Sequence, residues 1–252
     1  MKFWFNCLAH LMLPKGHGYQ ARLRDKPCLE KAKRGKAAWV EVRGVGWQTT
    51  THGVKKRNYA SRDDYQRHQA AKLDVIVGKG HGFRKIDILE YRIRFWRRFR
   101  HLRSFLDPDA NLLCLGARQG TEVEVLRELG YRNASGIDLN PGPDNPLVNH
   151  GDFANIEVPD NYLDLVYTNC LDHAFGLDEF FIEQTRVLKD SGLILMDITT
   201  NDEAGHFESM QWNRPEDVLV VALQYFRNIV MLQREKRWVW TLMSHPIKRH
   251  DP

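Results

Sequence analysis

The sequence predicts an α/β protein of Rossmann-like type: a mainly parallel seven-stranded sheet with helices on both faces, preceded by a basic helical N-terminal extension. Three observations indicate this class. Short apolar runs alternate with amphipathic helical patterns through the C-terminal half of the chain. A turn bracketed by Gly116 and Gly120 separates the first such run from the first of these helices. Asp138 closes the second run, a position typical of ligand-contacting acids in nucleotide-binding α/β units.

Charge is distributed unevenly along the 252 residues. Residues 1–110 hold 25 Lys and Arg against 10 Asp and Glu, whereas the remainder holds 12 against 22. Such asymmetry predicts parts with different roles. We expect a basic, partly irregular segment over residues 1–60, a helical lid or extension over 61–107, and an α/β domain over 108–252.

Cysteine usage and hydropathy restrict the class of protein further. The four cysteines contain no closely spaced pair, which argues against a disulfide framework or a zinc site and indicates a reducing, cytoplasmic location. No apolar run is long enough to cross a bilayer. The apolar residues 1–14 favour a docked or membrane-touching helix over a signal peptide.

Two helices are expected before the sheet. Residues 14–60 are expected to be largely irregular, apart from a short strand or hairpin between Trp39 and Trp47. Ser61 and Asp64 form a capping-box-like start for a helix that ends at Gly78. A second helix should span residues 86–106, because apolar residues recur there at three- and four-residue steps. Its other face carries Arg92, Arg94, Arg97, Arg98, Arg100 and Arg103.

The α/β part divides into alternating elements. Strands are expected at residues 112–115, 135–139, 147–153, 163–169 and 193–198, followed by a pair at 228–233 and 237–244. Helices are expected at residues 121–129, 177–188 and 215–227, with residues 189–192 forming a turn after the second.

From Asn111 to Ile198 the chain resembles class I S-adenosylmethionine-dependent methyltransferases, in particular the broad type 11-like group with small Rossmann-like domains. The matching pieces, in order, are LLCLGARQGTE, GIDLN, HGDF, LDLVYTNCLDH and FFIEQTRVLKDSGLILMDI. The resemblance implies an enzyme, a methyltransferase domain over 108–252 and S-adenosyl-L-methionine as the cofactor.

The same pieces suggest where the cofactor binds. Gly116 lets the backbone approach the methionine part, and Asp138 can accept hydrogen bonds from the ribose hydroxyls. The resemblance implies that Asp152 accepts from the adenine amino group and that Phe153 contacts the ring. The expected cofactor-binding residues are Gly116, Ala117, Gly120, Asp138, Leu139, Asp152, Phe153 and Asn169.

The glycine turn departs from the commonest pattern of the family. Cys114 stands where an acid is usual, and Arg118 stands within the small-residue turn. Glycines occur only at 116 and 120, so the run lacks the G-x-G-x-x-G spacing of a dinucleotide site. This spacing argues against NAD.

His173 and Asp172 are the candidate catalytic residues, because they follow the fourth strand at the crevice end of the sheet. A histidine can remove a proton near pH 7 if the acceptor is a hydroxyl or a protonated nitrogen. His173 could instead line the cofactor or substrate pocket, or be structural.

The expected function is methyl transfer to an unidentified acceptor, by default a small molecule, a sugar or a lipid-linked compound. The alternative is a non-catalytic binding module that contacts an anionic partner through its basic N-terminal region. That region has three interpretations: a lid with solvated arginines, a peripheral surface for anionic membrane or phosphorylated substrate, and, less favoured, a nucleic-acid contact.

Overall fold

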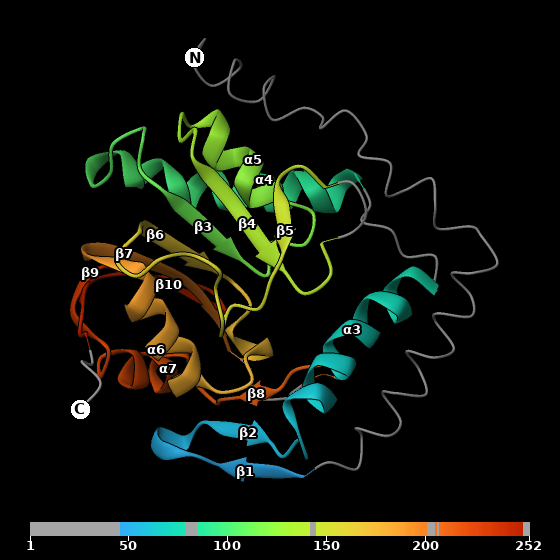
Figure 1. Ribbon diagram of the computed structural model, residues 1–252. Coiled ribbons are helices and arrows are strands. Elements are labelled where there is room, and N and C mark those ends of the chain that lie inside the picture. The colour runs from blue at the N-terminus through green and yellow to red at the C-terminus, as the bar shows by residue number, and fades with distance from the viewer. Residues whose placement is uncertain (1–45, 79–84, 142–144, 201–204, 206, 249–252) are drawn as a thin grey trace.

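The computed structural model describes residues 46–78, 85–141, 145–200, 205 and 207–248 (Figure 1). Its main sheet has seven strands in the order β5-β4-β3-β6-β7-β10-β9. Their bounds are β3 Leu112–Leu115, β4 Ala134–Asp138, β5 Val148–His150, β6 Leu163–Thr168, β7 Leu188–Thr199, β9 Phe226–Glu235 and β10 Trp238–Pro246. Strands β3 to β7 are parallel, and β10 runs antiparallel to both β7 and β9. The predicted fold class is confirmed.

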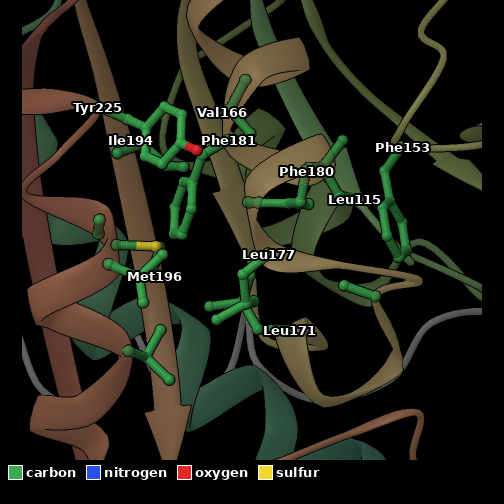
Figure 2. Packing of buried hydrophobic residues seen from close by; sticks show 14 of the residues in the cluster. Leu115, Phe153, Val166, Leu171, Leu177, Phe180, Phe181, Ile194, Met196 and Tyr225 are labelled. Carbon is green, nitrogen blue, oxygen red and sulfur yellow. The ribbon is translucent and has the colours of Figure 1, made fainter. Parts of the chain in front are cut away.

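Helices cover both faces of this sheet (Figure 1). Helices α4 (Lys85–Phe99) and α5 (Thr121–Glu128) lie on one face, and α6 (Leu177–Val187) and α7 (Pro215–Ala222) lie on the other. Each face has its own buried apolar cluster. Figure 2 shows Phe180 and Phe181 of α6 packed toward Val166, Ile194 and Met196 of the central strands. Burying a side chain of this size stabilises the fold by about 1.5–3 kcal/mol.

The N-terminal part forms a second, smaller layer. Strands β1 (Trp47–Thr49), β2 (Lys55–Arg57) and β8 (Met210–Gln211) form an antiparallel sheet, with a 3-10 turn at Thr51–Gly53. The expectation of irregular structure up to residue 60 is therefore wrong for β1 and β2, which pair with each other, while β2 also pairs with the distant strand β8. Residues 39–45 of the expected strand or hairpin lie outside the described part of the chain.

Helix α3 (Arg62–Gly78) follows this small sheet and begins and ends close to the predicted bounds. The Ser61 hydroxyl accepts a hydrogen bond from the Asp64 backbone N–H at 3.1 Å and donates to the Asp64 carboxylate at 3.0 Å. This is the capping contact that the sequence predicted. In Figure 1, α3 lies at the end of the main sheet toward which β3 and β4 point.

Three predicted boundaries are corrected. The helix over 86–106 is α-helical only to Phe99 and continues as a 3-10 helix over Arg100–Ser104. Residues 189–192 belong to β7, because Leu188 already pairs with Leu163 before an irregularity in the register. The helix that starts at Pro215 ends at Ala222, because Phe226 begins β9.

The arginine face of α4 is also corrected. Arg92 and Arg98 are 3% and 2% exposed. Arg92 pairs with Glu124 and Glu128 of α5, and Arg98 pairs with Asp197 of β7. These two arginines therefore attach α4 to the domain and are unavailable to solvent or a partner. Among the described residues, no helix combines the length and apolar content that membrane crossing requires.

Candidate functional site

The glycine turn between β3 and α5 has the backbone that its sequence requires. Gly116 and Gly120 have φ angles of 65° and 81°, which favour glycine. A Cβ atom on Gly116 would lie 2.4 Å from the Cys170 Sγ atom, which follows β6. Arg118 also has a positive φ, of 36°, at a cost of about 1 kcal/mol for a residue with a side chain. The turn is therefore held in a strained, close-packed form beside the end of β6.

Asp138, the last residue of β4, faces this turn. Its Oδ2 atom accepts a hydrogen bond from the Arg118 backbone N–H at 3.0 Å, and Oδ1 accepts one from the Asn140 N–H at 2.7 Å. Each oxygen of a carboxylate has two lone-pair positions, so one on each remains for a ligand hydroxyl. Both oxygens of Asp138 can therefore still accept a further hydrogen bond, and its role as a ribose ligand stays a prediction.

Asp152 lies after β5 and is joined to α3. Its Oδ2 atom accepts from Arg62 Nη2 at 2.8 Å and Gln66 Nε2 at 3.3 Å, while Oδ1 accepts from the Ala154 N–H at 2.9 Å. The ring of Phe153 lies in the core, edge-on to Phe180 with centroids 5.7 Å apart (Figure 2). Asp152 is thus held by the helix that covers this end of the sheet.

The other predicted cofactor residues lie along the same edge. Ala117 is buried in the turn, and its N–H donates to the Ile137 carbonyl at 3.1 Å. Leu139 follows β4 and Asn169 follows β6, both half-buried. The eight predicted residues therefore lie at or just beyond the carboxyl ends of four neighbouring strands, β5, β4, β3 and β6. This is the edge where open α/β sheets bind ligands.

Beyond β6, the residues Leu171–His173 form a short 3-10 helix, η4, that carries both predicted catalytic residues. The Nε2 atom of His173 lies 2.5 Å from Lys72 Nζ and 3.8 Å from Asp172 Oδ2. Its Nδ1 atom lies 3.0 Å from the Phe207 carbonyl oxygen. Burial lowers the pKa of His173 to about 3 and raises the pKa of Asp172. His173 is therefore neutral at pH 7.

Residues 61–107 were expected to form a helical lid or extension, but none of the predicted site residues lies on α3 (Arg62–Gly78). Tyr65 OH donates to the His173 carbonyl at 2.7 Å, and Gln69 Nε2 donates to the Phe207 carbonyl at 2.8 Å. Burial also lowers the pKa of Lys72. One signal could have revealed this face, because polar residues recur along α3 at one- to four-residue steps, namely Arg62, Tyr65, Gln66, Gln69 and Lys72.

Potential ligand atoms of Asp172, His173 and Glu208 lie within 4.8 Å of one another. Carboxylate and imidazole groups at this separation resemble a cation site. However, Lys72 contacts the Nε2 atom of His173, and Phe207 contacts the other ring nitrogen. Because both ring nitrogens of His173 already have partners, we assign no ion to this group.

The strand order, the reversed strand β10 and the acid at the end of β4 agree with the fold implied by the resemblance to class I S-adenosylmethionine-dependent methyltransferases. Residues 113–196 match the family described as "Methyltransferase domain". This segment holds the glycine turn, Asp138 and η4. Over this segment the chain is therefore similar to methyltransferase domains, a class whose cofactor is S-adenosylmethionine.

Solved structures share this fold at low sequence identity. A Burkholderia thailandensis 1,6-didemethyltoxoflavin-N1-methyltransferase, with bound 1,6-didemethyltoxoflavin and S-adenosylhomocysteine, is 15% identical with a TM-score of 0.58, covering 80% of this chain and 99% of its own. A protein from Pyrococcus horikoshii OT3 is 19% identical with a TM-score of 0.52, covering 66% and 100%. The [4+2]-cyclase SpnF is 15% identical with a TM-score of 0.51, covering 63% and 80%. A comparison with curated proteins finds no match.

Proposed function

We propose that the protein transfers a methyl group from S-adenosylmethionine to a small-molecule acceptor, which includes a sugar or lipid-linked compound. The observation that carries this proposal is the position of α3 across the ligand-binding edge of the sheet. Its side chains bond to groups beyond three different strands: Asp152 after β5, His173 after β6 and Phe207 after β7.

Helix α3 covers the site and is fixed there by hydrogen bonds, which favours a small acceptor. Arg62 and Gln66 attach the first turns of α3 to Asp152, and Gln69 and Lys72 attach the next turns to Phe207 and His173. Methyl transfer from a sulfonium depends mainly on positioning and the exclusion of water, and a cover of this kind supplies both. A folded nucleic acid or protein surface would have to displace α3 before reaching the strand ends.

The cofactor assignment follows from the same edge. In this proposal the backbone of the turn at Gly116, Ala117 and Gly120 contacts the methionine part, and Asp138 receives the ribose hydroxyls. Leu139 and Asp152 flank the adenine. The Asp152 carboxylate accepts hydrogen bonds both from the adenine amino group and from Arg62. Asn169 follows β6, next to the glycine turn. The ring of Phe153 is packed in the core, so this residue contacts the adenine through its backbone.

When bound, the cofactor supplies an electrophilic methyl group. The chain then has to hold the acceptor in line with that group and keep water out. Asp172 and His173 are proposed for the acceptor end of the site, because η4 places them directly below α3. A relative of the same fold with a bound small heterocycle, the 1,6-didemethyltoxoflavin enzyme, supports a small acceptor.

The experiment that tests this proposal uses S-adenosylmethionine labelled with tritium in the methyl group. The protein is incubated with a host extract that ultrafiltration has divided into small-molecule and macromolecular fractions. We expect enzyme-dependent label in the small-molecule or lipid-extractable products. Asp138→Ala serves as the control that lacks the ribose contact, and Asp109→Ala, a change at an exposed carboxylate, serves as the matched surface control. Label found only in protein or nucleic acid would contradict the proposal.

A further inference from the structure

Lys72 is an unusual residue for the covered face of a helix. Its side chain points from α3 into the site, where Nζ lies 2.5 Å from His173 Nε2. Lysine is among the side chains least often buried without a charged partner in contact. Burial in this position lowers the pKa of its ammonium group from the ordinary value of 10.5. The geometry thus places an amine of reduced basicity beside the end of β6.

The hydrogen-bond partners of His173 determine which of its two ring nitrogens carries the hydrogen. The Phe207 carbonyl oxygen can only accept, so the Nδ1 atom at 3.0 Å must carry the hydrogen. Because the ring is neutral, its Nε2 atom is then bare and accepts an N–H from Lys72. The only lone pair of the imidazole available for proton removal is already occupied. His173 therefore orients the lysine amine and is poorly suited to act as a base itself.

The charged and titratable groups that face Lys72 come from four segments. Arg118 of the glycine turn disfavours the ammonium form, whereas Asp172 of η4 and Glu208 after β7 favour it. Cys170 faces it from the end of β6, and its Sγ atom also lies against the Gly116 backbone. Lys72 is thus located where the glycine turn, the end of β6 and the segment after β7 converge.

We propose that Lys72 is the catalytic residue that takes a proton from the methyl acceptor, and that His173 is the positioning residue that holds the Lys72 amine. This inference rests on the proposed function. The acceptor class is narrowed to compounds whose reacting atom carries a removable proton, either a hydroxyl or a protonated amine.

The step balances without a further reactant. An electron pair on the acceptor oxygen or nitrogen forms the new bond to the methyl carbon, and the breaking S–C bond returns its pair to sulfur. The proton of the acceptor O–H or N–H moves to the lone pair that the Lys72 amine carries in its deprotonated form. The resulting ammonium is stabilised by Asp172 and Glu208 and loses its proton to solvent when the product leaves.

The first test is a titration of the lysine ε-methylene signals by ¹H–¹³C NMR in the full chain saturated with S-adenosylhomocysteine. Lys72→Arg assigns the signal. We expect the Lys72 midpoint to lie below those of the other lysine signals. A midpoint at or above theirs would overturn the inference. Calorimetry on the same sample reports S-adenosylhomocysteine binding separately, so failure of the proposed function and failure of the lysine assignment are distinguishable.

The second test measures turnover with tritium-labelled S-adenosylmethionine and a panel of phenols, alcohols and amines. Lys72→Met should lower kcat by about 100-fold, the usual range for loss of a general base, while S-adenosylhomocysteine affinity stays within about threefold. The acid limb of the kcat–pH profile should vanish in Lys72→Met and be displaced in His173→Phe. An unchanged acid limb in Lys72→Met would overturn the inference, as would methylation confined to acceptors that have no proton to lose.

Discussion

The guanidinium of Arg98 on α4 and the carboxylate of Asp197 on β7 form a buried ion pair, with Nε and Oδ1 separated by 2.7 Å. The side chains are 2% and 0% exposed. The second carboxylate oxygen accepts a hydrogen bond from Tyr167 OH of β6 at 3.1 Å. Burial raises the pKa of Asp197, and Arg98 opposes this change. The pair joins the helix before the sheet to the two strands at its centre.

Removal of one partner from this pair should be strongly destabilising. Arg98→Met leaves a buried carboxylate without its cation and should lower the free energy of unfolding by about 3–5 kcal/mol. Urea denaturation followed by circular dichroism measures this change. Arg97→Met, at the exposed neighbouring position, is the matched control and should change stability little. Equal stability of the two variants would show that the pair does not hold α4 in place.

Gly116 and Cys170 should be energetically coupled. Gly116→Ala would place a methyl group 2.4 Å from the Cys170 sulfur, in addition to the cost of a positive φ. We expect a loss of about 2–4 kcal/mol, of which Cys170→Ala should recover roughly half in the double variant, because the steric part is relieved and the backbone strain remains. A double-mutant cycle by chemical denaturation provides the measurement, and additive effects would contradict the predicted contact.

Glu122, in the first turn of α5, should make stability depend on pH. Burial raises the pKa of its carboxyl from 4.5 to about 8. Between these values the folded chain keeps a proton that the unfolded chain has lost, so stability falls as pH rises from 4.5 to 8. Glu122→Gln should remove this slope and be more stable than the natural chain at pH 8 by on the order of 4 kcal/mol, with little difference at pH 4.5.

Urea denaturation at both pH values tests this prediction. Glu128→Gln is a useful control, because that carboxylate is also on α5 but is 47% exposed. If Glu122→Gln leaves the difference in the free energy of unfolding between pH 4.5 and pH 8 unchanged, the pH dependence does not come from Glu122.

The elements from Leu112 to Asp138 could be predicted from sequence because local signals agree there. A fully apolar run forms β3, glycine permits the turn, and an acid ends β4. The predicted cofactor residues lie along one edge because parallel strands bring their carboxyl ends together, whereas the roles of Asp152 and Phe153 came from the family resemblance. Where the local pattern was long and periodic, the element was found in the right place.

Residues whose roles depend on distant partners were not predictable in this way. Strand β2 is a run of three basic residues, and it forms because Lys55 and Lys56 pair with Gln211 and Met210 of β8. From the sequence, Arg98 was expected on the solvent-exposed face of its helix, because its partner Asp197 lies 99 positions away. Lys72 was missed for the same reason: a lysine on a polar helix stripe predicts exposure, and only the packing of α3 over η4 leaves it half-buried beside His173.

The central claim is that Asp138 receives the cofactor ribose, and calorimetry with S-adenosylhomocysteine tests it most directly. Asp138→Ala should weaken binding by about 10- to 100-fold, the effect of losing hydrogen bonds to a charged group. Asp138→Asn should lose less, because its amide oxygen can still accept one of them. Asp109→Ala should bind as the natural chain does. Affinity for Asp138→Ala within about twofold of the natural chain, or a folded natural chain that binds no S-adenosylhomocysteine, would contradict the account.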